Sequence, residues 1–113
     1  MAKLPNAHLA FVADEKLGGY LLNPTHKVGG PKLRFLEAFG FARSRPEEVR
    51  ASLLDHARTS EGAVASTPYG LKYELDGDLR TPSGRTPRVR TVWLVEPDAP
   101  PRFVSLKPLG RQA

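Results

Sequence analysis

Cysteine is absent from this chain of 113 residues, and so are long apolar runs. The first absence excludes disulfide bonds, thiolate nucleophiles and zinc sites built on cysteine. The second excludes a membrane-spanning helix, which needs about 18 consecutive apolar residues. The N-terminal stretch also lacks the apolar core and small-residue cleavage site of a signal peptide. We therefore expect a cytoplasmic protein that has no contact with membranes.

Motifs for metal and cofactor chemistry are missing as well. The three histidines stand far apart in the sequence, without paired ligand spacing and without a cluster of carboxylates. Gly29-Gly30 is not followed by the glycine and lysine of a phosphate-binding loop. No serine lies in a nucleophile elbow. We expect no metal and no cofactor.

Positive charge is abundant. The chain holds 17 Lys and Arg against 12 Asp and Glu, a formal net charge of +5, and 11 of the cations are arginine. Arginine presents a planar fork of donors that suits phosphate, so the composition favours a polyanionic partner, nucleic acid first. A genome rich in GC, or a thermophilic one, would also enrich arginine, and the composition alone leaves that alternative open.

The length predicts a single domain over residues 1–113. Helical patterns fill residues 1–60 and strand patterns residues 61–108, and residues 109–113 are expected to form a flexible tail. The predicted fold class is α+β, with about three N-terminal helices packed on one face of an antiparallel sheet of about four strands.

Three segments are predicted to be helical. The first covers residues 14–22 and the second residues 31–39, with Pro31 in its first turn. The third begins at "SRPEEVRASLLDHA", where Ser44 and Glu47 have the spacing of a capping box.

Strands are predicted further along the chain. Residues 71–75 alternate apolar and polar side chains, residues 88–96 are apolar on both faces, and residues 102–107 pair back after a proline-rich loop. The stretches at 76–78 and 82–84 have the composition of turns.

The stretch "NPTHKVGGPKLRF" (23–35) is the first candidate site. Backbone N–H groups at a helix start carry partial positive charge, and Lys27, Lys32 and Arg34 would strengthen an anion pocket there. His26 would exchange protons beside that pocket. The alternative is a basic surface loop.

Two further groups carry polar side chains of the same kind. Tyr69 and Lys72 lie in "TPYGLKY", a pattern that is also typical of a plain turn. Arg85, Arg88 and Arg90 come close together in the sequence, before and at the start of a predicted strand that also carries Thr91. Such arginines clamp phosphodiesters, although a polar sheet face is more often simply solvated. The single Trp is expected in the core.

Four blocks of the sequence carry a resemblance. They are "KLPNA" (3–7), "LLNPTHKVGGPKLRF" (21–35), "TPYGLKY" (67–73) and "GRTPRVRTVW" (84–93). Together they resemble an uncharacterised bacterial domain family that has no assigned activity. More loosely, helices followed by an antiparallel sheet resemble the barnase, EndoU, colicin and RelE group of metal-independent RNase toxins. That resemblance implies attack of an RNA 2′-hydroxyl on the adjacent phosphate.

The predicted function is therefore a toxin-like, metal-independent ribonuclease. The alternative is a non-catalytic RNA-binding module, or an antitoxin or immunity-type protein with a cognate protein partner. We expect the His26 and Arg85 side chains to lie within about 10 Å of each other, so that both reach one phosphate. The candidate catalytic residues are His26, Lys72, Arg85 and Thr91. The candidate phosphate and RNA contacts are Lys27, Lys32, Arg34, Tyr69, Arg88 and Arg90.

Overall fold

A computed structural model describes residues 1–110 of the chain. Its centre is one antiparallel sheet with the strand order β1-β2-β3-β4-β5. The strands are β1 (Ala2–Lys3), β2 (Glu61–Thr67), β3 (Gly70–Asp78), β4 (Arg88–Val95) and β5 (Arg102–Pro108). The helical segments are η1 (Ala7–Leu9), α1 (Asp14–Lys16), η2 (Leu17–Leu21), α2 (Gly29–Ala38) and α3 (Pro46–Thr59).

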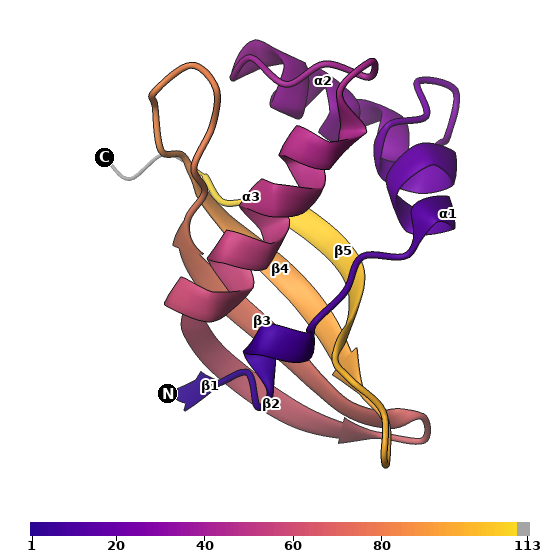
Figure 1. Ribbon diagram of the computed structural model, residues 1–113, viewed down its shortest axis with the longest axis vertical. Helices are drawn as coiled ribbons and strands as arrows, with labels where there is room; N and C mark the ends of the chain where they lie inside the picture. The colour runs from indigo at the N-terminus through magenta and orange to yellow at the C-terminus, as the bar shows by residue number, and fades with distance from the viewer. Residues whose placement is uncertain (111–113) are drawn as a thin grey trace.

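The helices fall into two groups around the sheet. α3 lies across one sheet face, over β3 and β4, whereas α1, η2 and α2 gather at one end of the molecule beside β5 (Figure 1). No helix among residues 1–110 has the length and apolarity to cross a membrane. The predicted tail at 109–113 lies mostly outside the described residues, although Leu109 donates its N–H to the Arg88 carbonyl.

The α+β class is confirmed, but the predicted number of strands is wrong. The sheet has five strands, and β2 is the longer of the two that no sequence pattern had predicted. Its residues 63–66 are small and exposed, so the strand shows none of the alternation that marks a half-buried strand. The turn predicted at 76–78 is also wrong, because these residues pair with β4 to the end of β3. The turn at 82–84 is present.

Two details of the predicted helix starts need correction. α2 begins at Gly29 rather than at Pro31, because the chain already turns around His26. The capping box at Ser44 does not form: Arg45 is the residue before α3, and no side chain there caps the helix. Pro46 does occupy the first turn.

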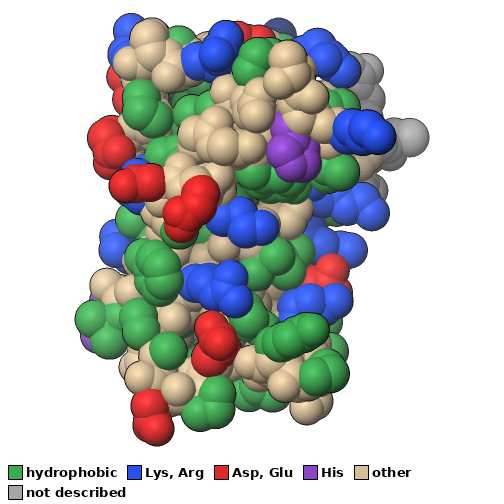
Figure 2. Space-filling view, turned by 90° about the vertical axis from the view of Figure 1, so that its right-hand side faces the viewer, with side chains coloured by type: hydrophobic (Ala, Val, Ile, Leu, Met, Phe, Trp, Pro, Cys, Tyr) green, Lys and Arg blue, Asp and Glu red, His purple; other side chains and the backbone are tan. Residues whose placement is uncertain are grey.

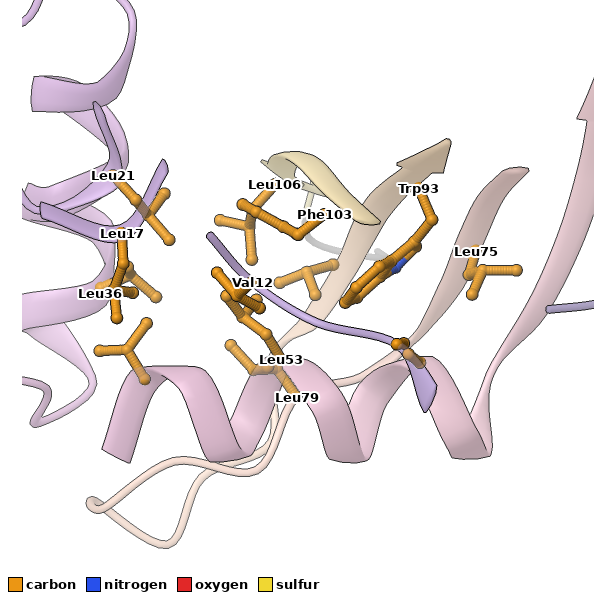
Figure 3. Packing of buried hydrophobic residues seen from close by; sticks show 14 of the residues in the cluster. Val12, Leu17, Leu21, Leu36, Leu53, Leu75, Leu79, Trp93, Phe103 and Leu106 are labelled. Carbon is orange, nitrogen blue, oxygen red and sulfur yellow. The ribbon is translucent and has the colours of Figure 1, made fainter. Parts of the chain in front are cut away.

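The core lies between α3 and the sheet and continues toward α2. Trp93 is fully buried, as expected, and its ring meets that of Phe103 edge to face at 5.4 Å between centroids. Leucines from the helices and strands fill the rest of this layer (Figure 3).

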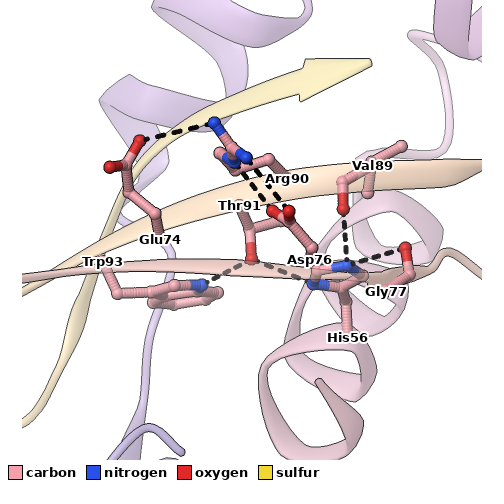
Figure 4. A network of polar contacts seen from close by, with 8 residues as sticks. All are labelled: His56, Glu74, Asp76, Gly77, Val89, Arg90, Thr91 and Trp93. Carbon is pink, nitrogen blue, oxygen red and sulfur yellow. Dashed lines mark hydrogen bonds and ion pairs between the residues drawn. The ribbon is translucent and has the colours of Figure 1, made fainter. Parts of the chain in front are cut away.

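A chain of hydrogen bonds crosses the core beneath α3 (Figure 4). The Trp93 indole N–H donates to the Thr91 hydroxyl at 2.8 Å. That hydroxyl lies 2.9 Å from His56 Nδ1, and His56 Nε2 lies 3.1 Å from the Gly77 carbonyl and 3.2 Å from that of Val89. Because carbonyls only accept, Nε2 carries the hydrogen and Nδ1 accepts from Thr91. His56 has no exposed surface, and burial, which lowers its pKa, favours this neutral form of the imidazole.

This imidazole should make stability depend on pH. Burial lowers the pKa of His56 below its ordinary value of 6.5, with smaller opposing effects from its carbonyl partners and nearby carboxylates. Below about pH 6.5 the imidazole binds a proton in the unfolded chain but stays neutral in the folded chain. The free energy of unfolding therefore decreases as the pH falls below this value. We expect the urea midpoint to decrease between pH 7 and pH 5.

Two substitutions test that assignment. His56→Gln keeps a donor and an acceptor but does not titrate, so its urea midpoint should change little between pH 7 and pH 5. His8→Asn on η1 should keep the wild-type decrease. Asp76 also has a lowered pKa, caused first by its hydrogen bond with Arg90, but its contribution is lost only near pH 4 and below. An equal slope in wild type and His56→Gln would contradict the prediction.

Candidate functional site

Five polar side chains meet beside β5, and we call them the Tyr20 cluster: Lys16, Tyr20, His26, Lys32 and Ser105. The Tyr20 hydroxyl lies 2.9 Å from the Ser105 hydroxyl, and Lys32 Nζ donates to the same Ser105 oxygen at 2.9 Å. Lys16 Nζ and Lys32 Nζ lie 5.1 and 5.6 Å from the Tyr20 ring centroid. The His26 ring meets the Tyr20 ring edge to face at 5.1 Å. Three cationic or ionisable nitrogen groups thus surround one phenol.

Glycine brings the helical part of the cluster together. A Cβ on Gly29 would lie 1.7 Å from the Tyr20 carbonyl oxygen, so only glycine lets α2 start this close to η2. Arg50 of α3 fixes the other side, because its guanidinium donates to the Val12 carbonyl and to Asp14 at the start of α1. α1, η2 and the first turn of α2 are thereby held as one unit.

A bulge in β5 presents Ser105 to this unit. Val92 pairs with Ser105 and Trp93 with Phe103, which leaves Val104 without a partner in the ladder. An extra residue of this kind bends a strand and changes the direction of its side chains. Ser105, from the edge strand, consequently reaches Tyr20 and Lys32.

His26 is held in one tautomer. Its Nδ1 accepts the backbone N–H groups of Val28 at 3.1 Å and Gly29 at 3.0 Å, and the Gly30 N–H donates to the His26 carbonyl. Because Nδ1 accepts, the ring hydrogen is on Nε2. The expected anion pocket of backbone N–H groups at this helix start is therefore not open, since His26 itself occupies those donors.

The Tyr20 cluster has more hydrogen-bond donors than acceptors. Tyr20 and Ser105 each own one hydroxyl hydrogen, and only one of the two lies in the bond between them. The hydrogen of the other hydroxyl therefore remains available. Lys32 gives one of its three ammonium hydrogens to Ser105 and keeps two, and His26 has its Nε2–H to donate. A ligand that matches this group must supply acceptors, as the oxygens of a phosphodiester do.

A hollow of about 560 Å³ opens beside the cluster. Lys16, Tyr20 and His26 line it on one side, Arg102 lines it from β5, and Glu15 contributes a carboxylate. Figure 2 looks onto this side of the molecule and shows Lys and Arg side chains down its middle, below a histidine. Among residues 1–110, no three His, Asp or Glu side chains gather as metal ligands.

The structure places His26 and the loop that carries Arg85 at opposite ends of α2, so the fold does not support the expected approach of these two side chains to one phosphate. His26 caps the N-terminal end of α2, whereas the loop that carries Arg85 is tied to the other end by a hydrogen bond from the Ser83 N–H to the Phe39 carbonyl. Ten helical residues span about 15 Å, and Arg85 is exposed in its loop.

The arginines and the threonine of β4 are engaged elsewhere. Arg90 binds Asp76 with two hydrogen bonds of 2.7 and 3.0 Å, which lower the pKa of that carboxyl, and lies 4.0 Å from Glu74. Arg88 lies 4.0 Å from Asp78. Thr91 has no exposed surface, and its hydroxyl belongs to the core chain of hydrogen bonds. Its burial keeps it away from any substrate.

The remaining candidates lie around the molecule. Lys27 and Arg34 are exposed near α2, and Lys32 alone from that helix joins the cluster. Tyr69 lies in the turn between β2 and β3 and Lys72 lies on β3, and both line a separate hollow.

Sequence patterns had not indicated Glu15, Lys16, Tyr20, Arg102 or Ser105 as site residues. A short helix followed by a π-helical turn does not show on which side Tyr20 lies, and the bulge that orients Ser105 leaves no mark in the sequence. One signal was present: Lys16 and Tyr20 are four residues apart, a spacing that places side chains on one helix face.

A family model covers almost the whole chain. Residues 3–110 match a family described as a domain of unknown function, DUF6883. The chain belongs to the DUF6883 family. The expected membership of a family without an assigned activity is thus confirmed. A comparison with curated proteins finds no match.

A solved structure has a fold similar to that of this DUF6883 domain. The fold is similar to a chain of a contact-dependent growth inhibition toxin–immunity protein complex from Klebsiella pneumoniae 342, with a TM-score of 0.62 and 17% sequence identity. The alignment covers 88% of this chain and 99% of that chain. At this identity the likeness shows a shared fold.

Proposed function

We propose that this domain is a toxin-type ribonuclease that cleaves RNA at the hollow beside the Tyr20 cluster. The observation that carries the proposal is the trio of Lys32, Ser105 and Tyr20, with hydrogens left to donate, next to a hollow that also holds a carboxylate. Fold likeness to a chain of a toxin–immunity complex supports a toxin or immunity-type role. The net charge of +5 supports a polyanionic substrate.

The positions of the side chains support the following roles. Lys16, Arg102 and the His26 Nε2–H would hold the phosphate oxygens and stabilise the charge that develops on them. Glu15 is the carboxylate of the hollow and would take the proton of the RNA 2′-hydroxyl. His26 acts as a donor through Nε2 in this scheme, because its Nδ1 already accepts two backbone N–H groups at the start of α2.

The bonds balance without an additional reactant. The 2′ oxygen loses its hydrogen to Glu15 and forms a bond to phosphorus, while the bond from phosphorus to the 5′ oxygen breaks. The leaving oxygen takes a hydrogen from the Ser105 hydroxyl, which Lys32 replenishes through their 2.9 Å hydrogen bond. The products are a 2′,3′-cyclic phosphate and a 5′-hydroxyl.

An RNA cleavage assay tests the proposal. Wild-type protein should release fragments that end in cyclic phosphate. Glu15→Gln should reduce the rate by about 10²- to 10⁴-fold, the usual contribution of a positioned base, with RNA affinity retained. The matched control is Glu37→Gln, an exposed carboxylate on α2.

RNA that stays intact for hours across pH 5 to 9 would rule out the ribonuclease. The alternatives would then be non-catalytic RNA binding, if the protein still binds RNA, or an immunity-type role with a protein partner, if it does not.

A further inference from the structure

A second hollow lies on the sheet face away from α3. It measures about 480 Å³ and is lined by Tyr69, Lys72, Leu94, Arg102 and Val104, among others. Side chains alternate along a strand, so Lys72 and Leu94 point away from the face where their neighbours Tyr73 and Trp93 are buried. The hollow therefore combines an aromatic ring, an aliphatic floor and two cations.

The turn between β2 and β3 holds Tyr69 in place. The Thr67 hydroxyl donates to the Gly70 carbonyl at 2.7 Å and accepts the Tyr69 N–H at 3.1 Å. Gly70 has a φ of 143°, and a Cβ there would lie 2.5 Å from the Val95 carbonyl oxygen, so the turn packs tightly on β4. The Tyr69 side chain is 74% exposed on this fixed backbone. Its ring can receive a flat ligand without ordering the chain beneath it.

The two cations flank the apolar floor. Lys72 pairs with Leu94 across the β3–β4 ladder, and Leu94 pairs with Arg102 across β4–β5. Adjacent strands are about 4.8 Å apart, which places one cation on each side of Leu94. Arg102 contacts Glu96 through Nε at 3.3 Å, and its terminal amino groups lie outside that contact.

Arg102 connects this hollow with the candidate active site. It lines both hollows, the one with Tyr20 and His26 and the one with Tyr69. A strand whose phosphate lies in the first hollow would pass Arg102 and bring a neighbouring nucleotide to Tyr69. An apolar ring and floor between two cations match an unpaired base with a phosphate on each side.

We propose that the Tyr69 hollow is a subsite for one unpaired base of a single-stranded RNA, stacked on the Tyr69 ring, with Lys72 and Arg102 on the adjacent phosphates. The identification of the strand as RNA rests on the proposed function. Stacking tolerates every base, so the subsite selects unpaired strands over duplexes rather than a sequence.

Binding measurements on a slowly cleaving background test the subsite. In Lys32→Ala protein, fluorescence anisotropy with a labelled single-stranded RNA should show about 5- to 150-fold weaker binding after Tyr69→Ala, since stacking contributes about 1–3 kcal/mol per base. Tyr69→Phe should bind normally, because the ring is kept. Lys72→Ala should reduce the salt slope by about 0.7. Val64→Ala, an exposed apolar side chain elsewhere on the sheet, should change nothing.

Oligonucleotides with one abasic residue identify the contact itself. At one position of the oligonucleotide, loss of the base should weaken binding to the protein that has Tyr69. The same loss should not change binding to the Tyr69→Ala protein. The subsite would be overturned if Tyr69→Ala bound single-stranded RNA with unchanged affinity, or if it weakened the binding of duplex RNA as much as that of single-stranded RNA. This holds even if the wild-type protein cleaves RNA. If wild type cleaves nothing but the Tyr69 and abasic effects remain, the subsite stands and the ribonuclease proposal alone fails.

Discussion

Lys32→Ala should reduce RNA cleavage by about 10²- to 10³-fold in kcat/KM. Lys32 contacts the Ser105 hydroxyl and lies over the Tyr20 ring, so its removal takes away the source of the proton for the leaving oxygen and a positive charge beside that oxygen. Single-turnover cleavage of a labelled RNA measures the effect. Lys3→Ala, on β1 and outside the Tyr20 cluster, controls for the loss of one positive charge and should cleave at nearly the wild-type rate.

Lys32→Arg separates the two contributions of this lysine. Arginine keeps the charge but does not deprotonate in proteins, so it cannot replenish a proton on Ser105. We expect Lys32→Arg to recover RNA affinity and little of the cleavage rate. Full recovery of the rate would assign Lys32 to charge stabilisation alone, and an unimpaired Lys32→Ala would remove the Tyr20 cluster from the mechanism.

Thr91→Val should destabilise the fold by roughly 2–6 kcal/mol without altering chemistry at the site. Valine has a similar volume, but it leaves the His56 Nδ1 and the Trp93 N–H buried without partners, at about 1–3 kcal/mol each. Urea unfolding measures the change. Thr91→Ser keeps the hydroxyl and should cost about 1 kcal/mol for the lost methyl group.

The same variant decides whether Thr91 takes part in catalysis, as the sequence suggested. Below the unfolding transition, Thr91→Val protein should cleave RNA at the wild-type rate per folded molecule. If folded Thr91→Val protein does not cleave RNA, Thr91 is a catalytic residue after all. If Thr91→Val is as stable as the wild type, the core hydrogen bonds contribute little to stability.

The sequence by itself determined the α+β class, the approximate positions of α2, α3, β3, β4 and β5, and the burial of Trp93. These features depend on neighbours along the chain: the period of apolar residues, Pro46 in a first turn, and the alternation in residues 71–75. β2 was not predicted, because Ala63 and its neighbours are small and exposed. Only their pairing with β3 makes them a strand.

The sequence also indicated two members of the candidate site, His26 and Lys32, because a histidine and a lysine near a helix start are a local pattern. Only the tertiary structure decided their partners. Tyr20 and Ser105 are 85 residues apart, and a bulge in β5 brings them into contact. Arg85 and Thr91 show the converse, since residue type suggested a role while the fold placed one at the far end of α2 and the other in the core. A site is an arrangement in space, and contacts between distant segments depend on the packing of the whole chain rather than on local propensity.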